Sequence, residues 1–288
     1  YASLRASRDA RRDRELTMAE IGRDTRETGA EALVDRVRRH ETVRAVAGRI
    51  SAGLPRADVS GLRGSSPAFV VAALRASLDR TAIVVCPDEE RARDAFADFQ
   101  TVSSGRVEFF PERDVFPRRL ELRENPEIRG RRHACLDQLL RGGADIVVTS
   151  LLGYLEKTLP AGVFREHVIE LVLGASLDLD GLRGRLVLLG YEAASIVEEP
   201  GEFAVRGSIV DVYDPSHDHP VRLELSADEI ASIRLFEIET QRSFDPAQSI
   251  RLRPATGVIL DGDWCPSLAE RLTGAGLGEE TAARIRGE

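Results

Sequence analysis

One glycine-rich stretch of this sequence has the spacing of a loop that binds phosphate groups through its backbone amides. Its members lie directly before an apolar, helix-like run and are Gly61, Gly64, Ser65, Ser66, Pro67 and Ala68. In a working loop of this kind, a lysine and a serine or threonine occupy the positions of Pro67 and Ala68. The lysine reaches the β- and γ-phosphates, and the hydroxyl group holds Mg²⁺. The sequence therefore predicts a degenerate phosphate loop.

Proline and alanine cannot replace these two side chains. Neither carries a charge or a hydroxyl group, and Pro67 also removes one of the backbone N–H donors that would cradle a phosphate. The only lysine of the chain, Lys157, follows Glu156 instead of a glycine, so it is no displaced loop lysine. We therefore expect no catalytic residue and no cofactor, with a residual nucleotide-binding or ATPase module as the alternative.

No pattern of cysteines and histidines predicts a metal site. Cys86, Cys135 and Cys265 are far apart and match no paired spacing, which favours reduced thiols in a cytosolic protein. His217 and His219 are separated by one residue, but they lie in a turn-like run rich in Asp and Pro. No further cysteine or histidine stands nearby to complete a tetrahedral site, so a loop is the favoured interpretation.

The composition is that of a globular protein with an acidic balance. The chain has 288 residues, of which 42% are hydrophobic and 31% charged, which is enough material for two domains. The formal net charge of −8 argues against nucleic acid as the main ligand. The arginines near the N-terminus are interleaved with acids, which favours a helix face of mixed charge over a DNA-binding arm.

Two kinds of targeting segment are not expected from the sequence. No run reaches the roughly 18 apolar residues that a membrane span requires. The arginine-rich stretch before Met18 lacks the apolar segment of a signal peptide. Met18 is the only methionine and thus the candidate natural start.

The first half of the sequence alternates helical patterns with short β-branched runs. Three such runs predict buried strands, at Thr81–Pro87, Val107–Pro111 and Asp145–Ser150. Helical patterns surround them at 19–52, 70–78, 88–99 and 151–159. Continuous apolar strands separated by helices are typical of a parallel sheet that is covered on both faces.

After Pro160 the pattern changes to consecutive strands. A single helix is expected from Asp180 to Gly190, where the glycine would end it as a cap. Alternation of apolar and polar residues then predicts strands at Ala194–Glu199, Glu202–Tyr213, Pro220–Ser226 and Ile230–Glu239. Strands that follow one another without helices indicate an antiparallel α+β module, distinct from the first half.

Several blocks of the sequence together resemble one protein family. They are GLRGSSPAF, VEFFPERDVFP, ADIVVTSLLGYLEKTLP, the long run Gly190–Phe244, and LRPA. Over about 59–255 the chain resembles the N-terminal, UvrB-like region of the bacterial transcription-repair coupling factors. The excision-repair protein UvrB itself is similar, but it has an intact phosphate-loop lysine and a tyrosine-rich hairpin. The stretch Pro111–Arg132 contains no tyrosine and is too short for that hairpin, which favours the coupling factors.

The resemblance implies an α/β fold in which a degenerate P-loop, helicase- or UvrB-like parallel-sheet domain carries an inserted α+β antiparallel-sheet domain. We expect an N-terminal extension and helix at 1–52, and the degenerate P-loop α/β domain at 53–160. The UvrB-like domain that interacts with UvrA would span 161–254. Residues 255–288 would begin the returning, truncated part of the first domain.

The resemblance also implies a function. The chain would be a fragment without enzymatic activity that recruits UvrA, linking stalled RNA polymerase to nucleotide excision repair in the bacterial cytoplasm. ATP-dependent DNA translocation, and the contacts with RNA polymerase and DNA, would belong to other parts of the longer parent protein. We expect a monomer without membrane contact. A UvrB-like domain that binds damaged DNA stays open as an alternative.

By the same resemblance, UvrA would contact Arg206 and Arg222, with Glu224 and Ser226 beside them. Strand alternation places the last three of these residues on one face and the intervening leucines toward the core. The family commonly has phenylalanine where this chain has Ser226, so one aromatic anchor is missing.

Two details of this surface follow from the residues themselves. Gly207 lies inside a predicted strand directly after Arg206, and an interior glycine predicts a β-bulge that re-aims the side chain. Two exposed guanidinium groups would bind carboxylates of a partner bidentately. Glu224 would orient Arg222.

Overall fold

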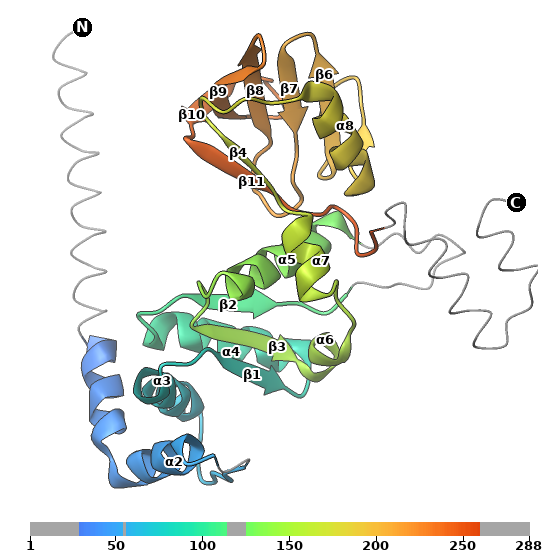
Figure 1. Ribbon diagram of the computed structural model, residues 1–288. Helices are drawn as coiled ribbons and strands as arrows, with labels where there is room; N and C mark the ends of the chain where they lie inside the picture. The colour runs from blue at the N-terminus through green and yellow to red at the C-terminus, as the bar shows by residue number, and fades with distance from the viewer. Residues whose placement is uncertain (1–28, 54–55, 114–124, 260–288) are drawn as a thin grey trace, which may run out of the picture. The chain divides into compact units, whose positions relative to one another are not determined.

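The computed structural model describes residues 29–53, 56–113 and 125–259, and these fall into two compact units (Figure 1). The first unit comprises Tyr1–Glu112 and Cys135–Glu156, and the second comprises Arg113–Ala134 and Lys157–Glu288. The first is built on a parallel sheet and the second mainly on antiparallel strands, which confirms the predicted mixed α/β class with two kinds of sheet.

The first unit contains the three predicted strands. They are β1 (Ala82–Cys86), β2 (Val107–Phe110) and β3 (Ile146–Ser150), and they form a parallel sheet in the order β1-β3-β2. The helices of this unit are residues 29–39, α2 (Glu41–Ser51), α3 (Ser66–Leu78), α4 (Glu89–Val102) and α6 (Leu151–Leu155). A further helix, α5 (Pro126–Leu140), contributes its residues up to Ala134 to the second unit and the rest to the first.

The central strand β3 explains why this sheet forms. All five of its residues are buried, because the sheet is covered on both of its faces there. Ile146 and Val148 pack with α3 and α4, including Phe99. Val147 points to the other face and packs with Phe110 and the α5 residue Cys135.

The helix boundaries of the first unit agree with the predicted signals in part. The helix expected at 70–78 begins at Ser66, and the described part of the stretch expected at 19–52 is two helices separated at His40. Asp88 caps α4 by accepting a hydrogen bond of 2.9 Å from the Arg91 amide. The predicted helix 151–159 is wrong in length, because α6 ends at Leu155 and Glu156 already has an extended backbone. Of the helical stretch expected at 19–52, residues 19–28 lie outside the described residues.

The second unit is a six-stranded sheet with its main core on one face and a smaller buried cluster, Val197, Ala204, Tyr213 and Phe236, on the other. The strands β5 (Glu192–Ala193), β6 (Glu202–Arg206), β7 (Ile209–Val212), β8 (Val221–Ser226), β9 (Glu229–Phe236) and β10 (Ser243–Pro246) pair in the order β10-β9-β8-β7-β6-β5. A two-stranded ribbon of β4 (Ile169–Val172) and β11 (Ser249–Leu252) lies with α8 (Leu179–Leu188) on the core side, and α7 (Ala161–Glu166) precedes β4 (Figure 1). Leu186, Val210 and Leu223 are fully buried there.

Two predicted strands of this unit are corrected. The segment Ala194–Glu199 is not a strand, because the Glu202 carboxylate accepts the Glu198 and Glu199 amides at 2.8 and 2.9 Å. The predicted strand Glu202–Tyr213 is a hairpin, β6 and β7, joined by Gly207 and Ser208. Gly207 has a φ of 61°, as the first residue of a tight two-residue turn requires, so it makes a turn instead of a bulge.

A buried polar cluster fastens the end of β11 to the turn after β7. The Arg253 amide donates to Asp214 Oδ2 at 2.7 Å, and the Arg253 carbonyl accepts from the Tyr191 hydroxyl at 2.8 Å. His133 Nδ1 donates to the Pro254 carbonyl at 2.7 Å. Because nearly all the backbone and side-chain groups that meet here are buried, each needs its partner for the unit to fold.

The predicted cap at Gly190 gives a stability test. This residue follows α8 with a φ of 83°, and an added Cβ would lie 2.7 Å from Cβ of Thr256. We expect Gly190→Ala to lower the free energy of unfolding by about 2 kcal/mol, since a left-handed backbone disfavours any side chain. Gly184→Ala is the matched control, because it meets open space within the same helix and should stabilise by up to about 1 kcal/mol. Urea unfolding of both variants measures these changes in the free energy of unfolding. Equal changes in the two variants would contradict the special role of the backbone at Gly190.

His133 gives a pH test. Burial, together with the nearby Arg129 and Arg132, lowers the pKa of His133 to about 4, against the opposing effects of the Pro254 bond and of Asp214. The unfolded chain therefore binds a proton at a higher pH than the folded chain, and stability falls as the pH drops from about 6.5 to 4, by up to about 3 kcal/mol.

We expect His133→Asn to reduce the loss of stability between pH 6.5 and 4, because the Asn amide can still donate to the Pro254 carbonyl but does not titrate. Urea unfolding at a series of pH values measures it. The exposed His40→Asn is the control and should leave the slope unchanged. An unchanged slope in His133→Asn would show that another group is responsible.

Candidate functional site

A buried carboxylate, Asp211, lies at the centre of the sheet face that α8 does not cover. Its neighbours along β7, Val210 and Val212, point into the core, so alternation directs Asp211 to the opposite face. Asp211 Oδ1 accepts from Arg222 Nε at 2.7 Å, and Asp211 Oδ2 accepts from Arg222 Nη2 at 2.9 Å. Oδ2 also accepts from Arg206 Nη2 at 2.5 Å. One fully buried carboxylate thus binds two arginines from two neighbouring strands.

Arg222 is held from two further sides. Its Nη1 donates to the Gln241 carbonyl at 3.0 Å, and Nη2 lies 3.3 Å from Gln241 Oε1. The guanidinium carbon lies 4.5 Å from the ring centre of Phe236. Gln241 adopts a φ of 55°, a left-handed backbone that a glutamine rarely takes. Hydrogen bonding to Asp211 raises the pKa of Arg222, against the effect of burial.

The two predicted contact arginines are therefore brought together, but not as two exposed groups. Only 15% of the Arg222 side chain is exposed, and four hydrogen bonds occupy its five N–H groups almost completely. Arg206 is 44% exposed and makes one side-chain hydrogen bond, to Asp211. The expectation of two free bidentate clamps is wrong for Arg222, because its fork is already filled by Asp211.

Glu224 and Ser226 lie further along β8. Both are exposed, and the intervening Leu225 packs against the core as expected. The register shifts between Glu224 and Leu225, where β9 has one extra residue, Ala231, so the bulge lies on β9 opposite this part of β8. Of the two acids, Asp211 and not Glu224 orients Arg222, because Asp211 is the one that accepts hydrogen bonds from its guanidinium.

Three residues of this face were missed by sequence reasoning. Asp211 is a lone acid in the apolar run Ile-Val-Asp-Val, which is a signal for a buried charge that needs a partner. In the strand register, Arg234 of β9 and Asp211 of β7 lie on either side of Arg222 of β8. The three residues therefore form one row across the sheet. Gln241 lies beyond β9 in a turn, and no pattern in the sequence points to it. We define Arg206, Asp211, Arg222 and Arg234 as the arginine face.

The glycine loop lies where the sequence places it, directly before α3, which begins at Ser66. Gly61 and Gly64 have φ values of 82° and 54°. The Ser66 hydroxyl donates to the Arg63 carbonyl at 2.7 Å and accepts from the Arg63 amide at the same distance. The Ser65 hydroxyl donates to Asp98 Oδ1 at 2.9 Å. Both serines are thus occupied by the protein itself.

A cavity of about 420 Å³ adjoins this loop. Most of its lining is apolar and includes Pro67, Ala68 and Val84. Asp94 and Asp98 line it as well. Arg91 lines the cavity too, so two carboxylates stand against one cation, and this negative balance disfavours a phosphate group by like-charge repulsion.

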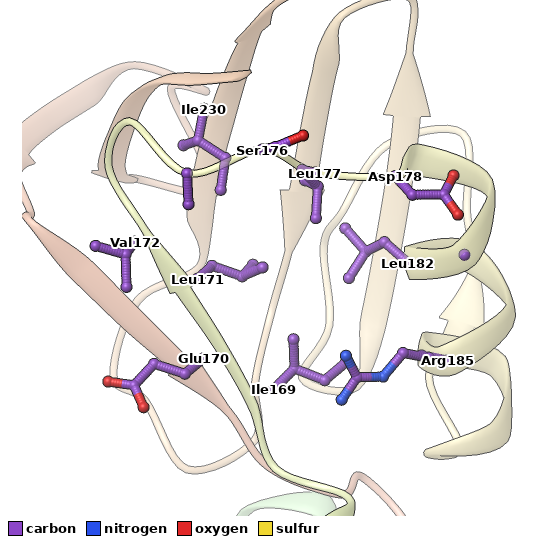
Figure 2. A pocket seen from close by; sticks show the side chains of 12 residues that line it. Ile169, Glu170, Leu171, Val172, Ser176, Leu177, Asp178, Leu182, Arg185 and Ile230 are labelled. Atoms are coloured by element: carbon purple, nitrogen blue, oxygen red, sulfur yellow. The ribbon is translucent and has the colours of Figure 1, made fainter. Parts of the chain in front are cut away.

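A second cavity, of about 330 Å³, lies between α8 and the β4–β11 ribbon (Figure 2). Buried side chains of Ile169, Leu171 and Leu182 form part of its lining. Figure 2 shows Arg185 reaching from α8 toward Ile169, while Asp178 stands at the start of the same helix. The lining holds one cation and two acids, and one of these acids, Glu170, is paired with Arg251, so the charges favour neither an anionic nor a cationic ligand.

The two histidines of the His-x-His pair make separate contacts. His217 Nε2 lies 3.1 Å from Arg253 Nη1, and His219 stacks edge-on against Phe244 with ring centres 5.0 Å apart. Within residues 29–53, 56–113 and 125–259, no group of three potential metal ligands occurs. In that same part of the chain, every helix is too short or too polar to cross a membrane.

Removal of the central carboxylate tests the arginine face. Asp211→Ala leaves two guanidinium groups close together without a counter-charge. We expect it to lower the free energy of unfolding by about 2–3 kcal/mol. This is less than the cost of breaking a fully buried ion pair, because Arg206 is partly solvated. Asp245→Ala on β10 is the control, because that side chain is exposed. Urea unfolding compares the two, and equal stability of both variants would contradict the central role of Asp211.

Comparison with known proteins places this face within a recognised domain. Residues 169–257, which contain β4 to β11, match the family of the UvrB interaction domain. The chain is 33% identical over 219 residues to the transcription-repair-coupling factor of Myxococcus xanthus, covering 73% of this chain and 18% of the relative. It is 30% identical over 209 residues to that of Bacillus subtilis, covering 72% of this chain and 18% of the relative.

The transcription-repair-coupling factor of Staphylococcus epidermidis is 29% identical over 215 residues, again 18% of its length. The chain therefore spans about a fifth of the length of the curated relatives that it matches. This chain is accordingly related to the transcription-repair-coupling factors, and it corresponds to a fragment of these proteins that contains a UvrB interaction domain.

Proposed function

We propose that this chain recruits UvrA through the arginine face and so links a stalled RNA polymerase to nucleotide excision repair. The observation that supports this proposal most is a coincidence of two features. The UvrB interaction domain match covers 169–257, and the buried Asp211 with its two arginines stands in the middle of that range. Solvent-facing charge fixed by a buried counter-charge is an arrangement suited to partner recognition.

The charges of this face favour an acidic partner surface. Arg206, Arg222 and Arg234 are opposed by Asp211 and Glu224, which leaves a local positive balance on a chain with a net charge of −8. Of the two arginines at Asp211, Arg206 has more free N–H groups and the larger exposed fraction of its side chain. It is therefore the side chain that binds a partner carboxylate directly.

Arg222 supports the same contact indirectly, through Asp211. It shares Asp211 with Arg206, so its positive charge keeps the carboxylate from neutralising Arg206 fully. Its one remaining N–H group can donate to a partner oxygen. Glu224 and Ser226 would extend the surface along β8, where both side chains are exposed.

The chain itself is proposed to have no ATPase activity. Pro67 and Ala68 supply neither the cation nor the hydroxyl group of a working loop, and the charged residues of the adjoining cavity, Arg91, Asp94 and Asp98, have a negative balance. ATP-dependent DNA translocation, and contacts with RNA polymerase and DNA, would belong to regions of a longer parent protein.

Calorimetric titration with UvrA tests this proposal. We expect Arg206→Ala to weaken binding by more than about tenfold, or about 1.4 kcal/mol, with little change in thermal stability. Arg222→Ala should weaken binding and also lower the melting temperature, because it removes the main partner of a buried acid. Arg183→Ala on α8 is the matched control, since it removes an arginine of similar exposure from the covered side of the sheet.

Two outcomes would count against the proposal. The first is that the unmodified chain does not bind UvrA at all. The second is that Arg206→Ala and Arg183→Ala bind it equally well. In the first case, ATP titration of the same sample decides whether the nucleotide-binding alternative has to replace recruitment.

A further inference from the structure

We propose that Gln241 is a positioning residue of the arginine face. It lies in the turn between β9 and β10, and it orients Arg222 and, through Asp211, Arg206. Gln241 itself does not touch the partner. Its effect on UvrA binding rests on the proposed function, whereas its effect on Arg222 is a property of the isolated chain and is measured there.

The backbone of Gln241 has an unusual conformation. Its φ of 55° lies in the left-handed region, which disfavours most residues with a side chain. The turn accounts for this φ but not for a glutamine, because glycine would adopt it without strain. A strained residue of this kind persists when the contacts around it fix it, and such residues cluster at functional sites. The contacts of the side chain therefore indicate what the glutamine provides.

The side-chain amide of Gln241 is bound at both of its ends. Nε2 donates to the Ile238 carbonyl at 3.0 Å and to the Val197 carbonyl at 3.4 Å. Oε1 accepts from Arg222 Nη2 at 3.3 Å. Two carbonyls on one side and a guanidinium group on the other favour one orientation of the amide, with its oxygen toward Arg222. Val197 is fully buried in the smaller cluster with Phe236, so the amide is anchored on a packed part of the unit.

The backbone carbonyl of Gln241 is a second acceptor for the same arginine. It accepts from Arg222 Nη1 at 3.0 Å. The turn holds this carbonyl in place, because the Gln241 amide donates to the Glu237 carbonyl at 2.8 Å and the Glu237 amide donates to the Arg242 carbonyl at 3.1 Å. Asp211 thus occupies the Nε and Nη2 edge of the guanidinium group, and Gln241 occupies the Nη1 and Nη2 edge. With both edges bonded, the orientation of the guanidinium plane is fixed.

This orientation is passed from Arg222 to Arg206 through one oxygen atom. Asp211 Oδ2 accepts from Arg222 Nη2 at 2.9 Å and from Arg206 Nη2 at 2.5 Å. The position of Arg222 therefore sets the position of Oδ2, and Oδ2 sets where Arg206 is held. The contacts follow the strand order β9-β8-β7-β6, from the turn after β9 to the last residue of β6. Gln241 thereby influences the side chain that binds the partner without contacting it.

Gln241→Gly in the isolated chain tests the positioning role directly. Glycine keeps the left-handed backbone and its carbonyl but removes the side-chain amide. We expect phenylglyoxal to modify Arg222 about two- to tenfold faster, which is the factor that one net hydrogen bond contributes. The melting temperature should stay within about 3 °C, because relief of the strained backbone offsets the lost bonds. Asp79→Gly is the matched control, since Asp79 has a φ of 49° in the first unit, and it should leave the modification of Arg222 unchanged.

Calorimetric titration with UvrA tests the consequence for binding. We expect Gln241→Gly to bind about two- to tenfold more weakly than the unmodified chain, and Asp79→Gly to bind equally well. A double-mutant cycle tests whether Gln241 acts through Arg222. Arg222→Lys keeps a cation beside Asp211 but lacks the planar fork that reaches Gln241 as well. In that background, Gln241→Gly should weaken binding no further.

The outcomes distinguish the positioning role from the proposed function. If the unmodified chain did not bind UvrA, the proposed function would be wrong, while faster modification of Arg222 in Gln241→Gly would still support the positioning role. Unchanged modification of Arg222 in Gln241→Gly would overturn that role. An undiminished affinity of Gln241→Gly for UvrA would overturn it as well, and so would the same loss of affinity in the Arg222→Lys background. A melting temperature lowered by more than about 6 °C would assign Gln241 to folding and likewise contradict the positioning role.

Discussion

The buried carboxylate of Asp211 is the constraint on which the arginine face depends. A negative charge with no solvent exposure is strongly unfavourable unless cations and hydrogen-bond donors surround it. Arg222 supplies two of its hydrogen bonds from β8 and Arg206 a third from β6, so one acid fixes the side chains of the two strands beside its own. The cations are thereby held in place in the isolated chain, which would lower the entropy cost of the UvrA binding that we propose.

The opposite face of the same sheet makes this arrangement possible. Val210 and Leu223 lie in the core with α8, and their strand neighbours Asp211 and Arg222 must therefore point the other way. The tight turn at Gly207 sets the register of β6 against β7, so Arg206 reaches Asp211 diagonally. A slip of one residue would exchange the core side chains with the charged ones, so the core packing and the arginine face are specified together.

The sequence contained enough information for the elements whose signals are local. The β-branched runs of β1 and β3, the acidic cap at Asp88 and the glycine after α8 act within a few residues, and the structure confirms each. The shared carboxylate could not be predicted, because it depends on which residues of three strands lie side by side. The segment Ala194–Glu199 was misjudged for a similar reason, since a side chain four residues away takes up its amides.

The most direct test of the central claim measures how fast phenylglyoxal modifies each arginine with and without UvrA. The account predicts that UvrA slows the modification of Arg206 strongly and leaves Arg183 on α8 unchanged, because only the uncovered face meets the partner. Arg222 should react slowly in both samples, since Asp211 and Gln241 already hold its guanidinium group. Unchanged reactivity of Arg206 in a sample where UvrA is bound would contradict the account.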